Sequence, residues 1–289
     1  MSKDVWTIGR LLDWTAQYLT DKGSEFPRLD AEVLLAYSLG CPRIQLYVRS
    51  EEVASEELRT KFKGLIRQRV EGCPVAYLVG QKEFFSLAFE VNRSVLIPRP
   101  DTEVLVVETL RLAKPLSDAV VLDVGTGSGA IAIAVVKNHP GLTATAVDIS
   151  SEALAVAERN AQRHGVAERI TFIRSDLFDG LPPEMRFDFI VSNPPYIPTD
   201  AIPLLPAGVR DYEPRAALDG GPGGYKVIER MLAGAPSFLK PKGCLLIEIG
   251  VAQEVPVRER IGRLSAYGEP GTLTDYAGHP RVLRVQLGD

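Results

Sequence analysis

The sequence predicts an α/β protein in which a small helical domain precedes a larger domain built on a parallel sheet. In the first 75 residues, apolar side chains recur every three or four positions, as they do on the buried faces of helices. Beyond residue 99, short apolar runs alternate with helical patterns, which is typical of parallel strands covered on both faces. A length of 289 residues is sufficient for two such domains.

The composition is that of a soluble globular protein. Hydrophobic residues make up 45% of the chain and charged residues 24%, which excludes disorder and collagen-like repeats. Three cysteines without CxxC spacing and three scattered histidines predict neither a disulfide framework nor a metal site. The amino terminus lacks the apolar segment of a secretory signal, and no apolar run approaches the roughly 18 residues of a membrane span. We therefore expect a cytoplasmic protein that does not bind membranes.

The balance of charges indicates whether the protein is suited to binding nucleic acid. The chain carries 33 basic and 37 acidic side chains, a net charge of −4, and neither domain has a positive excess. A protein whose main ligand is a phosphate backbone usually shows such an excess. The balance therefore speaks against direct binding of nucleic acid.

Three helices are expected in residues 1–75. The first begins behind a capping Thr7, and its apolar face is Ile8, Leu11, Leu12, Thr15 and Leu19. The second runs from near Pro27 to Gly40. The third has glutamates at its start (51, 52, 56 and 57) and basic residues after them, and its apolar face is Leu58, Phe62, Leu65, Ile66 and Val70. The basic run is either a solvated face or a surface that meets an acidic partner.

Residues 76–98 are expected to form a β-hairpin linker. Residues 83–91 have an extended pattern, and Asn-Arg-Ser at 92–94 is a turn sequence. The motif Ile-Pro-Arg-Pro-Asp-Thr-Glu follows at 97–103, and its two prolines forbid a helix start before Asp101. Arg99 and Glu103 are candidates for an ion pair that holds the linker.

The second domain is expected over residues 99–289, with strands and helices in alternation. Strands are predicted at 119–124, 143–147, 170–173, 187–191, 244–249, 272–275 and 281–287. The last two form a hairpin-like end to the sheet. Helices are predicted to begin at 130, to run over 151–164 behind Ser150 or Ser151, and to run over 225–239.

A glycine loop joins the first of these strands to its helix. Its residues are Gly125, Thr126, Gly127, Ser128 and Gly129. Glycines permit a sharp turn and a close ligand, and the helix start offers free N–H groups. The next strand ends at Asp148, whose carboxylate can accept hydrogen bonds from both hydroxyls of a ribose. We therefore expect a nucleoside-containing cofactor here, with a ligand-free turn as the alternative.

Two cofactors fit the loop. The spacing Gly125-x-Gly127-x-x-Ala130 also matches the dinucleotide fingerprint, which leaves an NAD-dependent oxidoreductase open. Asp123, just before the loop, favours S-adenosylmethionine, because that cofactor is cationic at its sulfonium and amino groups and carries no phosphate. The preference does not decide between them.

The tetrapeptide Asn193-Pro194-Pro195-Tyr196 follows the fourth strand. It is either a plain turn or part of a site, since ligands of α/β sheets bind at the carboxyl ends of strands. The Asn193 side-chain oxygen and the Pro194 carbonyl can each accept one N–H of a planar –NH2 group. The prolines stiffen the loop, and Tyr196 can cover the flat group. These residues suit methyl transfer to an amide or ring amino nitrogen by positioning in a dry site.

These motifs, together with residues 212–218 (Tyr-Glu-Pro-Arg-Ala-Ala-Leu), resemble the release factor glutamine methyltransferases. The resemblance covers nearly the whole chain. It implies a seven-stranded, Rossmann-like class I methyltransferase domain that uses S-adenosylmethionine and releases S-adenosylhomocysteine. The implied substrate is the N5 amide of the glutamine in the Gly-Gly-Gln loop of class-1 peptide chain release factors, and the implied role of residues 1–75 is substrate docking.

The resemblance also implies site residues. Cofactor contacts carry over to Gly125 through Gly129, Asp148 and Asn193, and substrate contacts to Asn193 through Tyr196, with Asn193, Pro194 and Tyr196 in the catalytic role. Asp176 is a candidate partner of the adenine amino group or a helix or turn cap. Where the family often has tryptophan beside the adenine, this chain has Leu177, which would leave an apolar wall.

Three alternatives to this function remain. A methyltransferase acting on adenine or guanine amino groups would use the same tetrapeptide, although the charge balance opposes it. An NAD-dependent oxidoreductase leaves the tetrapeptide unexplained. A binding module without catalysis would not need the two acceptors.

Overall fold

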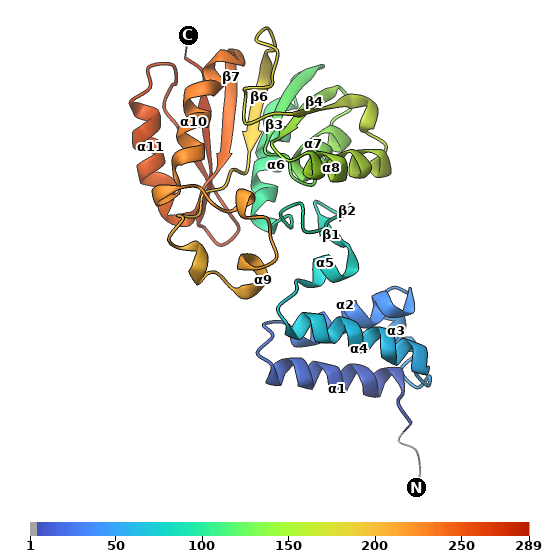
Figure 1. The fold of residues 1–289 in the computed structure, drawn as a ribbon. Coiled ribbons are helices and arrows are strands. Elements are labelled where there is room, and N and C mark those ends of the chain that lie inside the picture. Colours follow the sequence, from blue (N-terminus) through green and yellow to red (C-terminus); the bar gives the residue numbers. More distant parts are fainter. Residues whose placement is uncertain (1–4, 289) are drawn as a thin grey trace. The chain divides into compact units, whose positions relative to one another are not determined.

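The structure is a computed structural model that describes residues 5–288 (Figure 1). The chain divides into two compact units. One comprises the residues up to Gly80 together with Pro206–Tyr212, and the other comprises Gln81–Leu205 and the chain from Glu213 onward. The segment Pro206–Tyr212, which contains the short helix α9 (Ala207–Arg210), thus belongs with the helical unit although it lies far along the sequence. No helix among the described residues is long and apolar enough to cross a membrane.

The helical unit contains the three predicted helices. They are α1 (Ile8–Asp21), α2 (Pro27–Leu39) and α4 (Glu56–Val70). The Thr7 hydroxyl accepts the Arg10 N–H at the start of α1, and Gly40 ends α2 in the left-handed conformation. These helices bury one core, and the unit also contains the short helices α3 (Ile44–Val48) and α5 (Val75–Val79).

The third predicted helix begins later than its acidic residues suggest. Ser55 is the N-cap of α4 and accepts the Leu58 N–H, so Glu51 and Glu52 lie outside the helix. Two of the basic residues on α4 are ion-paired within the unit. Arg67 pairs with Glu71 one helical turn on, and Arg69 pairs with Asp30 of α2 at 2.8 Å.

The predicted hairpin consists of β1 (Gln81–Phe84) and β2 (Leu87–Glu90), which pair antiparallel. Phe84 and Phe89 are buried in the core of the sheet unit. Asn160 of a helix in that unit accepts the Glu90 N–H at 2.7 Å and donates to the Glu90 carbonyl at 3.0 Å. The hairpin is therefore an integral part of the sheet unit.

The sheet unit contains seven strands, and the predicted α/β class with a mostly parallel sheet is confirmed. The strands are β3 (Ala119–Val124), β4 (Leu142–Asp148), β5 (Ile170–Arg174), β6 (Phe187–Ser192), β7 (Leu239–Glu248), β8 (Gly271–Thr274) and β9 (Pro280–Gln286). Their order is β5-β4-β3-β6-β7-β9-β8. The first five strands run parallel, and β9 is antiparallel to both β7 and β8.

Helices cover both faces of the sheet, as Figure 1 shows. On one face are α6 (Glu103–Ala113), α7 (Ala130–Asn138) and α8 (Ser151–His164), and on the other are α10 (Lys226–Gly234) and α11 (Glu254–Gly262). Adjacent strand residues face opposite cores, as with Val121 and Leu122 of β3. Ser150 caps α8, as predicted. The helix predicted over 225–239 ends at Gly234, because Pro236 lacks the N–H that another turn requires.

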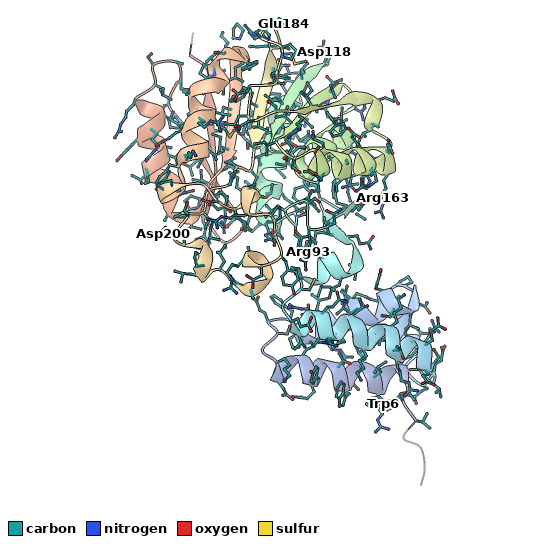
Figure 2. All side chains as sticks on the ribbon, viewed as in Figure 1. Trp6, Arg93, Asp118, Arg163, Glu184 and Asp200 are labelled. Carbon is teal, nitrogen blue, oxygen red and sulfur yellow. The ribbon has the colours of Figure 1, made fainter. Side chains whose placement is uncertain are left out.

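The topology places a binding site beside β3. Its neighbours are β4 on one side and β6 on the other, so the chain order reverses there, and ligands of open α/β sheets bind at the carboxyl ends of the strands at such a point. In Figure 2, Asp118 and Glu184 mark the opposite edge, where β3 and β6 begin. Arg93 and Asp200 are labelled at the edge where the predicted site residues lie.

Candidate active site

A pocket of about 780 Å³ opens at the carboxyl ends of the strands. It brings together most of the residues that the sequence singled out: Gly125, Gly127, Asp148, Asp176, Leu177, Asn193 and Pro195. Ser94, Val95 and Leu96, which precede the predicted domain start at residue 99, form part of its wall. The segment after Glu213, at positions 214–217, forms another part.

The first two loop glycines are shaped for a ligand. Gly125 and Gly127 have positive φ angles of 73° and 56°, which favour glycine. A Cβ added at either would meet no atom within 4 Å, so the space beside them is open to the pocket they line. Gly129 differs, because its Cβ would lie 2.8 Å from Ile133 Cδ1 and 3.1 Å from Ala157 Cβ. Gly129 therefore permits close helix packing.

Thr126 and Ser128 are buried and do not line the pocket. The Thr126 hydroxyl donates to Asp123 Oδ2 at 2.7 Å, and Asn160 donates to the Ser128 carbonyl at 2.9 Å. Asp123 lies beneath the loop and also accepts the Ala132 N–H at 3.1 Å. Burial raises its pKa to about 6. These side chains hold the loop in shape from below.

Asp148 lies at the tip of β4 and lines the pocket. Its two oxygens accept the N–H groups of Gly127 at 2.9 Å and Ser150 at 3.0 Å. Burial raises its pKa, and these backbone bonds oppose the shift. Each carboxylate oxygen has a second lone pair, so Asp148 can still accept two hydroxyl groups from a ligand.

Asp176 and Leu177 lie on a tight turn after β5. The Ser175 hydroxyl donates to the Leu177 carbonyl and accepts the Gly180 N–H, both at 2.8 Å. Leu177 has a positive φ of 54° and provides an apolar part of the pocket wall. The exposed Asp176 carboxylate pairs with Arg230 at 3.0 Å and makes no capping bond from its side chain among the described residues.

The tetrapeptide follows β6 and presents two acceptors. Asn193 Nδ2 donates to Thr102 Oγ1 at 3.0 Å. Within the described chain, neither the Asn193 side-chain oxygen nor the Pro194 carbonyl accepts a hydrogen bond. Tyr196 donates to Glu248 Oε1 at 3.4 Å, and burial raises the pKa of its phenol. Asn193 and Pro195 line the pocket, whereas Pro194 is buried beside it.

Sequence reasoning missed the residues that support the tetrapeptide. Gln253 donates to the Tyr196 carbonyl at 3.0 Å. A Cβ on Gly224 would lie 2.1 Å from that same carbonyl oxygen, which explains the glycine at 224. Glu248 is almost fully buried at the end of β7. An acid inside the apolar run at 244–249 was the signal that could have revealed it.

The predicted ion pair between Arg99 and Glu103 is wrong. Arg99 pairs instead with the buried Glu213 at 2.6 Å. Glu103 accepts the Phe85 N–H at 2.9 Å, in the turn of the β1–β2 hairpin. Arg99 and Glu213 are 114 positions apart, so their pairing leaves no local pattern in the sequence. Sequence spacing alone therefore suggested Glu103, the nearer acid.

Comparisons with known proteins match this architecture. The family model described as the PrmC N-terminal domain matches residues 10–80, and the methyltransferase small domain matches residues 101–202. A release factor glutamine methyltransferase from Rhodopirellula baltica is 46% identical over 285 residues, which is 97% of this chain and 96% of the relative. One from Geobacter sulfurreducens is 43% identical, over 99% of this chain and 98% of the relative.

The chain belongs to the release factor glutamine methyltransferase family. Membership confirms the resemblance seen in the motifs. The chain is an S-adenosylmethionine-dependent methyltransferase, and neither the oxidoreductase nor the non-catalytic module is favoured. Among solved structures, the catalytic domain of hMettl16 in complex with MAT2A 3'UTR hairpin 6 aligns with a TM-score of 0.57. It is 16% identical and covers 78% of this chain and 82% of that one, which shows a shared fold.

The pocket fits the cofactor of the family. The open faces of Gly125 and Gly127 leave room for a ligand against the backbone. Asp148 lies beside the loop, since it accepts the Gly127 N–H, and each of its oxygens keeps a free lone pair for a ribose hydroxyl. Leu177 supplies an apolar wall for a base. No group of three or more metal-ligating side chains occurs among residues 5–288.

Proposed function

We propose that this chain methylates the N5 side-chain amide of the glutamine in the Gly-Gly-Gln loop of class-1 peptide chain release factors. The observation that carries the proposal is a pair of unused acceptors: the side-chain oxygen of Asn193, which lines the cofactor pocket, and the carbonyl of Pro194, the next residue. A primary amide has two N–H donors, and two acceptors match them. The names of the relatives supply the release factor as the carrier of that amide.

The residues that would hold the cofactor are Gly125, Gly127, Asp148 and Leu177, with Asp176 at the rim. The glycines would admit it to the backbone, Asp148 would accept from its ribose hydroxyls, and Leu177 would supply an apolar wall for its base. Bound S-adenosylmethionine supplies a methyl group activated by its sulfonium. Asn193 also borders this part of the pocket.

The tetrapeptide would act by positioning. An amide nitrogen is a poor nucleophile because its lone pair is delocalised into the carbonyl group. Holding both of its hydrogens aims the nitrogen and spares the entropy of orienting it, an effect that reaches several kcal/mol, roughly 7 or more, in well-aligned systems. Pro194 and Pro195 stiffen the loop, and Gln253 fixes the Tyr196 backbone. The proton of the methylated nitrogen then leaves to water.

The helical unit would dock the intact release factor. Ile44 and Val48 on α3 are 67% and 73% exposed, and this unit contributes none of the pocket residues. Exposed apolar side chains that lie close together on one short helix are typical of a protein-binding surface. Because release factors act on cytoplasmic ribosomes, the site of action would be the cytoplasm. A protein substrate also agrees with the net charge of −4, which does not favour nucleic acid.

The test is methyl transfer from radiolabelled S-adenosylmethionine. Release factor, a release factor whose loop glutamine is replaced by alanine, duplex DNA, ribosomal RNA and buffer are compared. The proposal expects label only in the unaltered release factor. Label in either nucleic acid, or equal label in the glutamine-free factor, would overturn it.

A further inference from the structure

The Asn193 amide is the end of a hydrogen-bond chain that begins at a buried carboxylate. Asn193 Nδ2 donates to Thr102 Oγ1 at 3.0 Å, and Thr102 Oγ1 donates to Glu248 Oε2 at 2.6 Å. Thr102 and Glu248 are only 4% and 1% exposed. The three residues come from the tetrapeptide after β6, the turn before α6, and the end of β7.

The direction of these hydrogen bonds decides which way the Asn193 amide faces. An ionised carboxylate only accepts, so Thr102 must use its single proton on Glu248. The lone pairs of Thr102 then remain for Asn193, which can offer only its NH2 group. The Asn193 oxygen is thereby left at the opposite edge of the planar amide group, facing away from Thr102. We propose that Thr102 and Glu248 are positioning residues that hold the Asn193 oxygen towards the target amide.

The inference rests on the proposed function and explains the motif at 97–103, which that function leaves unassigned. Each polar residue of the motif has a separate anchor. Besides the Arg99 and Glu103 contacts described above, Asp101 pairs with Arg281 of β9 at 2.8 Å. These anchors fix the backbone on both sides of Thr102, as a hydroxyl that must meet two fixed partners requires.

Protonation of Glu248 would reverse the direction of the hydrogen bonds from Glu248 through Thr102 to Asn193. A protonated Glu248 can donate to Thr102, whose hydroxyl is then free to donate to the Asn193 oxygen, and the amide turns round. Burial raises the pKa of Glu248 to about 7, and the Thr102 hydrogen bond opposes the shift. The other groups that face it are Asp101, Arg281 and Tyr196, and Arg281 is paired with both Asp101 and Asp275. Methyl transfer is therefore expected to slow as the pH falls through about 7.

The first test is single-turnover methylation of release factor by Thr102→Val, which keeps the side-chain shape and removes the hydroxyl. The Asn193 NH2 loses its acceptor and turns towards the pocket, so kcat should fall by roughly 10- to 100-fold with little change in cofactor affinity. Thr102→Ser should restore most of the rate. Thr109→Val is the matched control, because Thr109 is similarly buried and its hydroxyl bonds, among residues 5–288, only to Leu105 of its own helix.

Two further measurements separate positioning from a structural role. In the Asn193→Ala background, Thr102→Val should have no added effect on kcat, because the amide that it orients is gone. The fall in the rate of methyl transfer below about pH 7 should disappear in Thr102→Val and in Glu248→Gln. Additive effects, or an unchanged rate and pH profile in a folded Thr102→Val, would overturn the inference.

A readout without catalysis completes the test. In the cofactor-free protein, the two side-chain amide protons of Asn193, assigned by comparison with Asn193→Ala, should shift with pH near 7 in ¹⁵N-edited NMR spectra. They should not shift in Thr102→Val. Absence of the shift in the wild type overturns the positioning chain even if release factor is methylated. Lack of methylation with the shift present overturns the proposed function instead.

Discussion

Asn193 donates to Thr102 across 91 positions of sequence, at a distance of 3.0 Å. This bond ties the tetrapeptide after β6 to the segment between the β1–β2 hairpin and α6. The segment also contributes Ser94, Val95 and Leu96 to the pocket wall. Residues 94–102 thus contribute to the candidate active site, and substitutions within them are expected to affect chemistry as well as folding.

Gly127→Val should abolish S-adenosylmethionine binding without unfolding the sheet unit. The branched side chain would fill the open space beside Gly127 and resist its φ of 56°. Gly165→Val is the matched control, because Gly165 has a φ of 68° and equally open space, yet does not line the pocket. Calorimetry should show loss of binding in the first variant and normal affinity in the second. Equal affinity in both would remove the glycine loop from the cofactor site.

Ile44→Asp combined with Val48→Asp should raise KM for intact release factor. Charges on this face of α3 would oppose an apolar contact, while a short peptide containing Gly-Gly-Gln should react as with the wild type. Val255→Asp is the control, since Val255 is 63% exposed on α11 of the other unit. Steady-state kinetics on both substrates measure the difference. If the double variant retains the wild-type KM for the intact factor, the helical unit does not dock it through α3.

Glu248→Gln should change the pH dependence of stability. The pKa of Glu248 is raised from 4.5 to about 7 in the folded protein, so the folded state binds this proton more tightly than the unfolded state does. The resulting contribution to the free energy of unfolding is complete below pH 4.5 and is lost as the pH rises through 7. Relative to the variant, the wild type should therefore lose up to roughly 3 kcal/mol of unfolding free energy between pH 4.5 and 8. Urea denaturation across this range gives the difference. Glu184→Gln, at an exposed glutamate of the same unit, is the control.

Local patterns were sufficient to predict most of the fold. The strands, the helix caps at Thr7 and Ser150, and the acid at the tip of β4 all follow from periodicity and neighbouring residues. Gly125, Gly127, Asp148 and Asn193 could be placed together because the carboxyl ends of parallel strands meet at one edge.

Contacts between distant segments could not be predicted in this way. Arg99 pairs with Glu213, and Thr102 with Glu248 over 146 positions, and neither pair has a sequence pattern. Gly129 and Ser128 belong to the glycine motif but turn into the core, which only the packing of α7 against α8 reveals. The assignment of Pro206–Tyr212 to the helical unit depends likewise on tertiary contacts.

Asn193→Asp should transfer the methyl group slowly, because the substitution introduces a charge. The aspartate keeps an acceptor but places a negative charge beside the pocket, where the cofactor sulfonium would lie. Such a charge stabilises the cationic ground state more than a transition state in which the cation is being neutralised. Cofactor affinity should therefore rise or stay constant while kcat falls, which calorimetry and single-turnover kinetics distinguish. A variant with weaker cofactor binding and normal kcat would contradict this explanation.

The most direct test of the acceptor pair is single-turnover methylation of release factor by Asn193→Ala at saturating S-adenosylmethionine. Asn138→Ala is the control, since in the described part of the chain that side chain bonds only to Ala134 of its own helix and does not line the pocket. Loss of one preorganised acceptor should lower the rate by roughly 10²- to 10³-fold, with the fold intact and cofactor affinity at most modestly weaker. A rate near that of the wild type would contradict the claim that Asn193 and Pro194 hold the target amide.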